Sequence, residues 1–321
     1  MERTKKVKRL TIPEEELMNP GHLACQGCGA TLAMRYALKA LGKNTIVTIP
    51  ACCWSVIDGP FPYSSLKVPV FHTAFATAAI TAAGIKAGLS IQGKDDVTVM
   101  AWAGDGGTFD IGIQALSSAA EKNEDIIYVC YDNEAYMNTG IQRSSATPYK
   151  AWTTTTPTDF PNETFKKDII EILAAHKIPY IATASVGYPE DLIKKFEKAK
   201  RIKGFRFIHI FAPCPVGWKM PPNLTVKVAK LAVQTNIFPL FEVENGIYYR
   251  ITRKFSKKVP VQEYLKLQGR FKHLTDNDIA TIQKSVDLRW EILLEKERQS
   301  ERYREIVRKY QEEKELATVE K

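Results

Sequence analysis

Two polar segments, each following an apolar run, carry residue types that could hold a metal-bound diphosphate. Gly104-Asp105-Gly106 follows the run 97–103, and Asn133 follows the run 125–131. The 28 residues from Asp105 to Asn133 leave room for one crossover helix, which we expect over 108–122. Strands connected in this way are parallel and end at the same edge of the sheet. A carboxylate and an amide oxygen would meet there, and both are ligands that Mg²⁺ accepts.

A Gly-Asp-Gly sequence after a strand is, on its own, usually only a turn. The pairing with Asn133, and the polar loop 134–142 that follows it, favour the diphosphate site over a plain turn. Gly104 and Gly106 would let the backbone approach the diphosphate without a Cβ in the way. His72 could also approach it, although a satisfied polar residue near a helix start is an equal alternative.

Six cysteines offer a second kind of chemistry. Cys25 and Cys28 are separated by two residues in a glycine-rich turn before a predicted helix over 30–41. This pattern fits a zinc knuckle, a redox disulfide or two iron–sulfur ligands. Cys53 and Cys214 could complete four thiolates, the usual ligand set of a [4Fe–4S] centre.

Composition and charge limit the class of protein. The chain has 321 residues, 45% of them hydrophobic, enough for one large or two modest domains. The sequence contains no run of about 18 apolar residues, so we expect no membrane span. No apolar region follows the basic segment 1–10, which we interpret as a solvated tail. Basic residues also concentrate over 250–272, which we interpret as a solvated face or subunit contact, with an acidic protein partner as the alternative. No nucleic-acid recognition motif accompanies this charge.

Alternating strands and helices predict an α/β fold, a mostly parallel sheet with helices on both faces. A long polar loop, 143–162, would cover the site or contact another chain. We divide the chain into a basic N-terminal tail (1–20), a cofactor-binding domain (21–224) and a mostly helical C-terminal extension (225–321) with a charged helical arm over 276–315. The other predicted segments are a strand over 45–49, a helix over 76–89 opened by 71–75, a helix over 167–176, a strand over 179–184, a helix over 189–201, a strand over 205–211, a helix over 225–235 and a hairpin over 241–251.

The segment from Gly104 to Gln142 resembles the thiamine diphosphate motif of thiamine-dependent enzymes. Within it, Tyr131 to Gly140 is similar to the β subunits of the pyruvate:ferredoxin oxidoreductases, and the resemblance covers roughly 21–246. It implies a thiamine diphosphate-binding fold and the reaction of pyruvate, coenzyme A and oxidised ferredoxin to acetyl-CoA, CO₂ and reduced ferredoxin. A sister enzyme for a branched-chain 2-oxoacid or oxalate is the alternative. A zinc-stabilised basic binding protein, in which Gly-Asp-Gly is only a turn, is the alternative from a different class.

The resemblance also implies which residues bind each cofactor. Asp105, Asn133 and the backbone carbonyl of Ala135 would hold Mg²⁺. Asn138 and Thr139 would lie beside the reactive ring of thiamine diphosphate and contact the substrate. One [4Fe–4S] cluster would be bound by a Cys-x-x-Cys pair, a third cysteine about two dozen residues later and a distant fourth, here Cys25, Cys28, Cys53 and Cys214.

Three details qualify this transfer. We prefer Cys53 to Cys52 because the family cysteine stands immediately before the residues at the place of Trp54-Ser55, and Cys130, inside a strand pattern, is most simply a core residue. Ala30 stands where single-chain relatives have an acidic residue. The glutamate that activates the cofactor has no assignable counterpart, so we expect an α subunit to supply it and this chain alone to turn over nothing. We also expect further γ and δ subunits, ferredoxin as the electron acceptor, and a location in the cytoplasm of an anaerobe.

Overall fold

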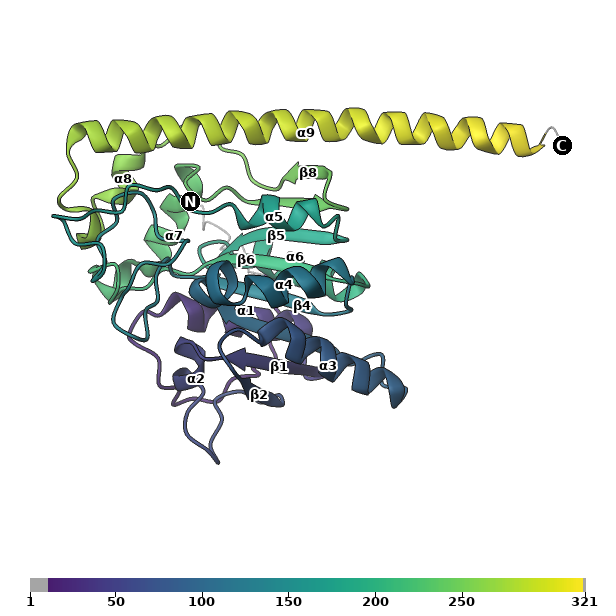
Figure 1. Ribbon diagram of the computed structural model, residues 1–321, viewed down its shortest axis with the longest axis horizontal. Coiled ribbons are helices and arrows are strands. Elements are labelled where there is room, and N and C mark those ends of the chain that lie inside the picture. The colour runs from purple at the N-terminus through teal and green to yellow at the C-terminus, as the bar shows by residue number, and fades with distance from the viewer. Residues whose placement is uncertain (1–10, 320–321) are drawn as a thin grey trace, which may run out of the picture.

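The computed structural model describes residues 11–319, with side chains described up to 309, so the predicted solvated tail over 1–10 lies outside the described part. One eight-stranded sheet forms its centre, and helices pack on both faces (Figure 1). The first six strands in spatial order are parallel to one another, and the last two pairings, β5 with β7 and β7 with β8, are antiparallel, which confirms the predicted α/β class. That order is β2 (Val70–Thr73), β1 (Thr45–Pro50), β3 (Thr98–Gly104), β4 (Ile127–Asp132), β6 (Arg206–Phe211), β5 (Tyr180–Ser185), β7 (Phe241–Glu244) and β8 (Tyr248–Ile251).

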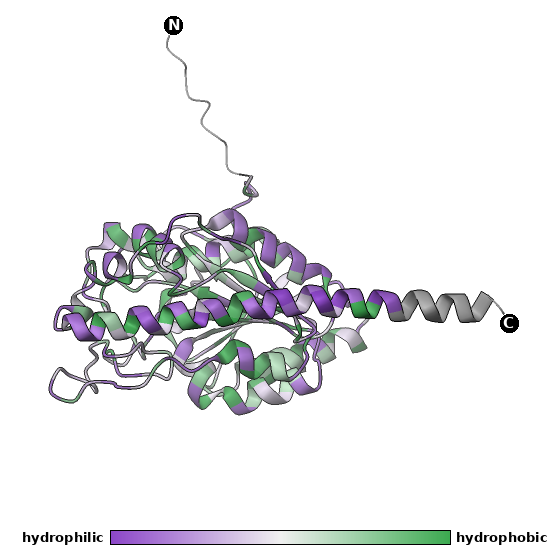
Figure 2. Cartoon of the chain, turned by 90° about the horizontal axis from the view of Figure 1, so that it is seen from above, coloured by the Kyte–Doolittle hydropathy of each residue, from purple (hydrophilic) through white to green (hydrophobic). Residues whose placement is uncertain are grey.

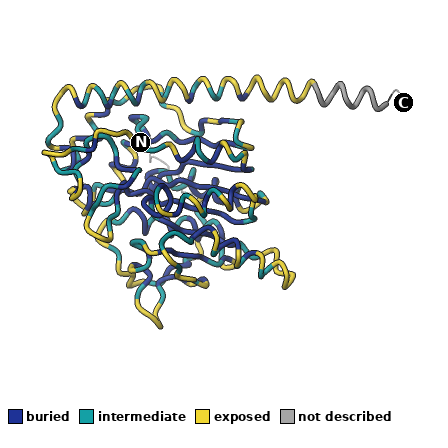
Figure 3. The backbone as a smooth tube through the Cα atoms, viewed as in Figure 1, coloured by how far each residue is buried: buried dark blue, intermediate teal, exposed yellow. Residues whose placement is uncertain are grey.

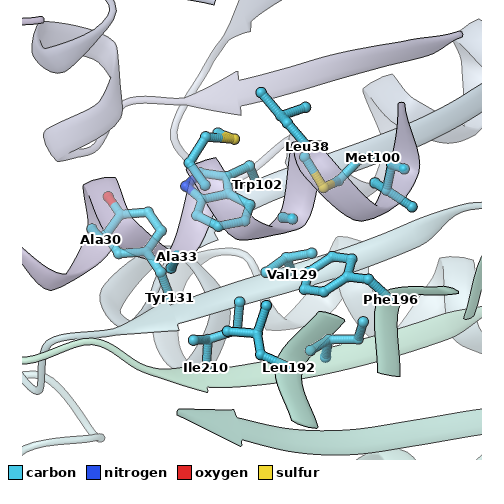
Figure 4. Close-up of a cluster of buried hydrophobic side chains, with 14 of the residues drawn as sticks. Ala30, Ala33, Leu38, Met100, Trp102, Val129, Tyr131, Leu192, Phe196 and Ile210 are labelled. Carbon is cyan, nitrogen blue, oxygen red and sulfur yellow. The ribbon is translucent and has the colours of Figure 1, made fainter. Parts of the chain in front are cut away.

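Alternate residues of the central strands enter two different hydrophobic cores, because side chains alternate between the faces of a sheet. Trp102 of β3 and Tyr131 of β4 enter the core shown in Figure 4, together with Phe196. Ala101 and Cys130, the neighbours of these strand residues, enter the second core, and Cys130 is thus the core residue predicted. Buried residues follow the sheet and the inner sides of the helices (Figure 3). The first core takes α1 (Gly29–Leu41) and α6 (Pro189–Arg201), and the second takes α3 (Ala78–Ile91), α4 (Ile113–Glu121) and α5 (Ile169–Ala175).

The structure differs from the sequence prediction at three places near the strand ends. The segment expected to open a helix at 71–75 is instead the edge strand β2, which carries few buried side chains and so lacks the apolar pattern of a central strand. The predicted crossover helix begins as a π-helix, Gly107–Ile111, before α4. The short helix α2, Cys53–Ile57, was not predicted, because five residues are too few for a periodic signal.

The C-terminal part of the chain adds to the same sheet. After α7 (Thr225–Gln234), the predicted hairpin forms β7 and β8, and β7 pairs with β5. The chain continues through α8 (Val261–Leu265) to α9 (Asp276–Val319), the predicted helical arm, which crosses β8 and runs on past the body (Figures 1 and 2). The division at 224/225 stays a prediction. Among the described residues, no helix combines the length and the apolar character that a membrane crossing needs.

Candidate functional site

The predicted diphosphate residues lie together at the carboxyl edge of the sheet. Strands β3 and β4 are parallel neighbours, with Gly104 opposite Tyr131, so the residues that follow each strand meet. They line a cavity of about 170 Å³, and Cys52 and Cys53, which follow β1, line it as well. The predicted residues in its lining are Gly104, Asp105, Gly106, Asn133, Ala135, Asn138 and Thr139.

Three oxygen atoms converge in this cavity. The amide oxygen of Asn133 faces Asp105 Oδ1 at 2.9 Å and the carbonyl oxygen of Ala135 at 3.0 Å. Neighbouring ligands of an octahedral Mg²⁺ lie about 3 Å apart, because each metal–oxygen bond is about 2.1 Å long. If the amide is turned over, its nitrogen donates a hydrogen bond to each of the same two atoms. The donor set and its spacing therefore fit the predicted magnesium ion.

Two buried carboxylates with different surroundings stand at this edge. Asp105 is 1% exposed and accepts a hydrogen bond from the Ser144 hydroxyl, a neutral group. Burial and the charge of Asp132 raise the pKa of Asp105 well above its usual value. Burial also favours a raised pKa at Asp132, but the charge of Lys166 and the hydrogen bond with His209 outweigh it and lower the pKa of Asp132 to about 2. Asp132 thus has a protein cation, Lys166, beside it, and Asp105 is the carboxylate that a bound divalent cation would neutralise.

Four cysteines line a second cavity of about 200 Å³, and they are the four predicted cluster ligands: Cys25, Cys28, Cys53 and Cys214. Their elements all reach the same edge of the sheet, since one pair precedes α1, Cys53 begins α2 after β1, and Cys214 follows β6. The two cavities adjoin, and they share Cys53, Asn133, Met137 and Asn138 in their linings. A group bound at the cysteines would therefore lie next to one bound at Asp105.

Burial favours the neutral form of two of these thiols, Cys53 and Cys214, so binding a metal through them as thiolates needs a positive group beside them. Burial, followed by the neighbouring thiols, raises the pKa of Cys53. Burial also raises the pKa of Cys214 to about 11, against the effect of the Gly217 N–H, which donates to its Sγ at 3.4 Å. Among the side chains that the structure describes, up to residue 309, no group of three Cys, His, Asp or Glu residues could hold one metal ion. A four-iron cluster binds each thiolate through a different iron atom, so it accepts a wider set of thiols than a single zinc ion does.

The remaining predicted residue lies elsewhere. His72 Nε2 lies 3.3 Å from Asp58 Oδ2, and the ring is outside the lining of the Asp105 cavity. This agrees with the alternative of a satisfied polar residue. Cys52 lines the Asp105 cavity but not the cysteine cavity, and its thiol accepts a hydrogen bond from Tyr131.

Comparisons with known proteins agree with this geometry. The model of the thiamine pyrophosphate enzyme, C-terminal TPP binding domain, matches residues 57–210. The chain is 56% identical over 296 residues to the ketoisovalerate oxidoreductase subunit VorB of Pyrococcus horikoshii, covering 89% of this chain and 95% of VorB. It is 50% identical over 281 residues to the pyruvate synthase subunit PorB of Methanothermobacter thermautotrophicus, covering 87% and 97%. The chain belongs to the β subunits of the 2-oxoacid:ferredoxin oxidoreductases.

A solved structure shows the same fold as this β subunit. The 2-oxoglutarate:ferredoxin oxidoreductase from Magnetococcus marinus, with 2-oxoglutarate, coenzyme A and succinyl-CoA bound, superposes with a TM-score of 0.55 at 24% identity. The match covers 66% of this chain and 70% of that one. The β subunit is therefore a thiamine diphosphate-binding subunit of an oxidoreductase, as the sequence motif predicted.

Sequence reasoning missed the residues of this β subunit that lie far away in the chain and bond to Asn133 or Glu134. Arg270 was grouped with the exposed basic stretch, but that interpretation is wrong for this residue, which is 1% exposed and bonded to Glu134. Lys166, four residues after the long polar loop 143–162, also reaches Glu134, and Trp218 donates to the backbone of Asn133. A buried arginine beside aromatic residues has no sequence signature that separates it from a solvated one, so no signal could have found it.

We expect Gly106→Ala to destabilise the β subunit and to weaken thiamine diphosphate binding. A Cβ at this position would lie 2.2 Å from Cε1 of Tyr136, and that ring is held by a 2.8 Å hydrogen bond from its hydroxyl to Asp110. Overpacking of this kind costs about 1–3 kcal/mol of unfolding free energy, which denaturant unfolding measures. Gly84→Ala is the matched control, because in the described structure no heavy atom lies within 4 Å of its Cβ position. Equal stability of the two variants would contradict the prediction.

Proposed function

We propose that this β subunit holds thiamine diphosphate, Mg²⁺ and one [4Fe–4S] cluster in an enzyme that converts pyruvate, coenzyme A and oxidised ferredoxin to acetyl-CoA, CO₂ and reduced ferredoxin. The observation that carries the proposal is the pair of adjoining cavities, one lined by converging oxygen ligands and the other by four thiols. A decarboxylating site and a one-electron acceptor would then share a wall that includes Cys53. This is the arrangement that an oxidative decarboxylation coupled to ferredoxin requires.

Each predicted residue has a place in this proposal. Asp105, Asn133 and the Ala135 carbonyl would ligate the metal, and the four thiols would ligate the cluster. Asn138 lines both cavities and Thr139 lines the first, where they would contact the 2-oxoacid. When bound, thiamine diphosphate would supply the electron sink for loss of CO₂, and the cluster would take the resulting electrons one at a time.

The Asp105 cavity lacks a second carboxylate that could activate the cofactor, and this supports the need for a partner chain. Asp105 is the only carboxylate among the described residues of its lining, and its place in the metal ligand set leaves none to activate the cofactor. We propose that an α subunit supplies this glutamate, that γ and δ subunits and ferredoxin carry the electrons away, and that the complex works in the cytoplasm of an anaerobe. The isolated β subunit should bind the cofactor weakly.

A second substrate has one observation in its favour. Identity to the ketoisovalerate oxidoreductase subunit of Pyrococcus horikoshii is 56%, against 50% to the pyruvate synthase subunit of Methanothermobacter thermautotrophicus. A branched-chain 2-oxoacid is therefore the second candidate. The zinc-binding alternative is disfavoured because the described side chains contain no group of three Cys, His, Asp or Glu residues that could hold one metal ion, and oxalate has no observation that favours it.

The test is an assay of the complex purified anaerobically with its α subunit. We expect CoA-dependent reduction of ferredoxin or a viologen with pyruvate, and compare its kcat/KM with those for 2-oxoisovalerate and oxalate. A higher kcat/KM for 2-oxoisovalerate would transfer the proposal to the second candidate. The β subunit alone is the control and should show no turnover. Appreciable activity without any partner would contradict the proposal that an α subunit supplies the activating glutamate.

A further inference from the structure

The residue between the two proposed magnesium ligands has an unusual backbone conformation. Glu134 follows Asn133 and precedes Ala135, and its φ of +67° is in the left-handed region. This conformation is unfavourable for a residue with a side chain. It turns the chain between the two ligands, and the side-chain amide of Asn133 lies next to both Asp105 and the carbonyl of Ala135. The geometry of the proposed metal site therefore depends on what holds Glu134.

Every polar group of Glu134 is occupied. Its N–H donates to Asp132 Oδ1 at 3.0 Å, and its carbonyl accepts from the Thr147 hydroxyl at 2.8 Å. Its carboxylate, 2% exposed, accepts from Lys166 at 3.1 Å and from Arg270 Nη2 at 2.5 Å. Contacts from three distant parts of the chain thus fix a single residue in a conformation that it would otherwise avoid.

Arg270 makes a second connection to the same loop. Its guanidinium lies 3.8 Å from the ring centre of Trp218, and Trp218 Nε1 donates to the carbonyl of Asn133 at 2.8 Å. The planar guanidinium can bind a carboxylate and stack on an aromatic ring at the same time, which an ammonium group cannot do. Arg270 therefore contacts the residue between the ligands directly and the first ligand through Trp218.

The cost of burying this arginine points to a role beyond packing. Its Nη1 is buried and has no hydrogen-bond partner among the described residues. A buried ion pair is often no better for stability than apolar residues of similar volume, and an unpartnered N–H makes it worse. What the arginine provides is a fixed position for Glu134.

We infer that Arg270 is a positioning residue for the magnesium site: it holds Glu134 in its left-handed conformation and so keeps the Asn133 amide next to both Asp105 and the Ala135 carbonyl. The inference rests on the proposed function, since it takes these three groups as the metal ligands. A residue that orients metal ligands without touching the metal typically contributes 10- to 100-fold to metal affinity. Loss of the Arg270 guanidinium should therefore appear in the affinity for Mg²⁺.

The test measures thiamine diphosphate binding to the complex of α and β subunits during a Mg²⁺ titration, by equilibrium dialysis. We expect Arg270→Met to raise the Mg²⁺ concentration at half-saturation by about 10-fold or more. The double variant Glu134→Gly/Arg270→Met should return it to within about threefold of the unmodified complex, because glycine adopts a positive φ without support. Arg250→Met removes an arginine–glutamate pair whose arginine is exposed, formed by Arg250 of β8 with Glu242 of β7, and should change nothing.

The double variant distinguishes a positioning role of Arg270 from a purely stabilising one. Loss of a structural ion pair would lower the melting temperature, and glycine at 134 would not restore Mg²⁺ affinity. An Arg270→Met complex with unaltered Mg²⁺ half-saturation, or a double variant no better than the single one, would overturn the inference. If Arg270→Met does not fold, Arg270→Lys gives the same decision, since half-saturation equal to that of the unmodified complex would overturn it. An unmodified complex that binds no thiamine diphosphate with Mg²⁺ would instead refute the proposed function.

Discussion

Replacing Asp105 by asparagine should abolish Mg²⁺-dependent binding of thiamine diphosphate at physiological concentrations of the metal. The amide has the same shape but no charge, and a divalent cation held by one carboxylate and two neutral oxygens loses its only protein anion. We expect the Mg²⁺ concentration at half-saturation to rise at least about 100-fold. This is a larger effect than the loss of metal affinity expected when a residue that only orients a ligand is changed. Equilibrium dialysis of the α and β complex against thiamine diphosphate measures it.

The same substitution should leave the fold intact or make it more stable. Burial raises the pKa of Asp105, so ionisation at neutral pH costs folding free energy that the unfolded chain does not incur. A neutral amide removes this cost, and the melting temperature of the metal-free β subunit should stay equal or rise. Asp159→Asn, an exposed change of the same kind, is the control and should alter neither quantity. Retained Mg²⁺ dependence in Asp105→Asn would show that this carboxylate is not a ligand.

The second large effect concerns the cluster. Cys53→Ser should reduce the iron bound per β subunit from about four to zero or to a substoichiometric remnant, with loss of the visible absorption of the cluster. A hydroxyl is a poor ligand for iron, and a cluster held by three thiolates is readily lost. The measurement is iron and sulfide content after anaerobic reconstitution, with the absorption spectrum as a second readout.

Cys52→Ser is the matched control, because it changes the adjacent residue in the same way. Cys52 lines the Asp105 cavity and bonds to Tyr131, whereas Cys53 lines the cavity shared with Cys25, Cys28 and Cys214. The cluster should therefore survive Cys52→Ser. If Cys52→Ser loses the cluster and Cys53→Ser retains it, the ligand is Cys52 and our choice within the doublet is wrong.

The sequence was sufficient to predict the parts of the site that depend on where strands end. Two apolar runs separated by one crossover place Asp105 and Asn133 at one edge, because parallel neighbours must end together. The structure has this arrangement, with Gly104 opposite Tyr131. The four cysteines were assigned from the family resemblance, and the structure places them at the same edge, at the ends of β1 and β6 or before α1. His72 lies outside both cavity linings.

Other features were out of reach because they depend on contacts between distant segments. The edge strand β2 is half-exposed, so its residues carry no alternating pattern. The pairing of Glu134 with Arg270 joins positions 136 residues apart, and neither residue type is expected to be buried. Local patterns report local structure, and these contacts become visible only after the sheet and the C-terminal segment are in place.

The distance along the chain between Glu134 and Arg270 also has a consequence during synthesis. The three proposed metal ligands leave the ribosome early, while the arginine that braces their loop follows 136 residues behind Glu134. At about 5–20 residues per second this delay is roughly 7–27 s. A nascent chain that has finished its parallel strands would therefore still lack a rigid metal loop. Premature loading of the cofactor onto an unfinished subunit would be disfavoured until translation has passed position 270.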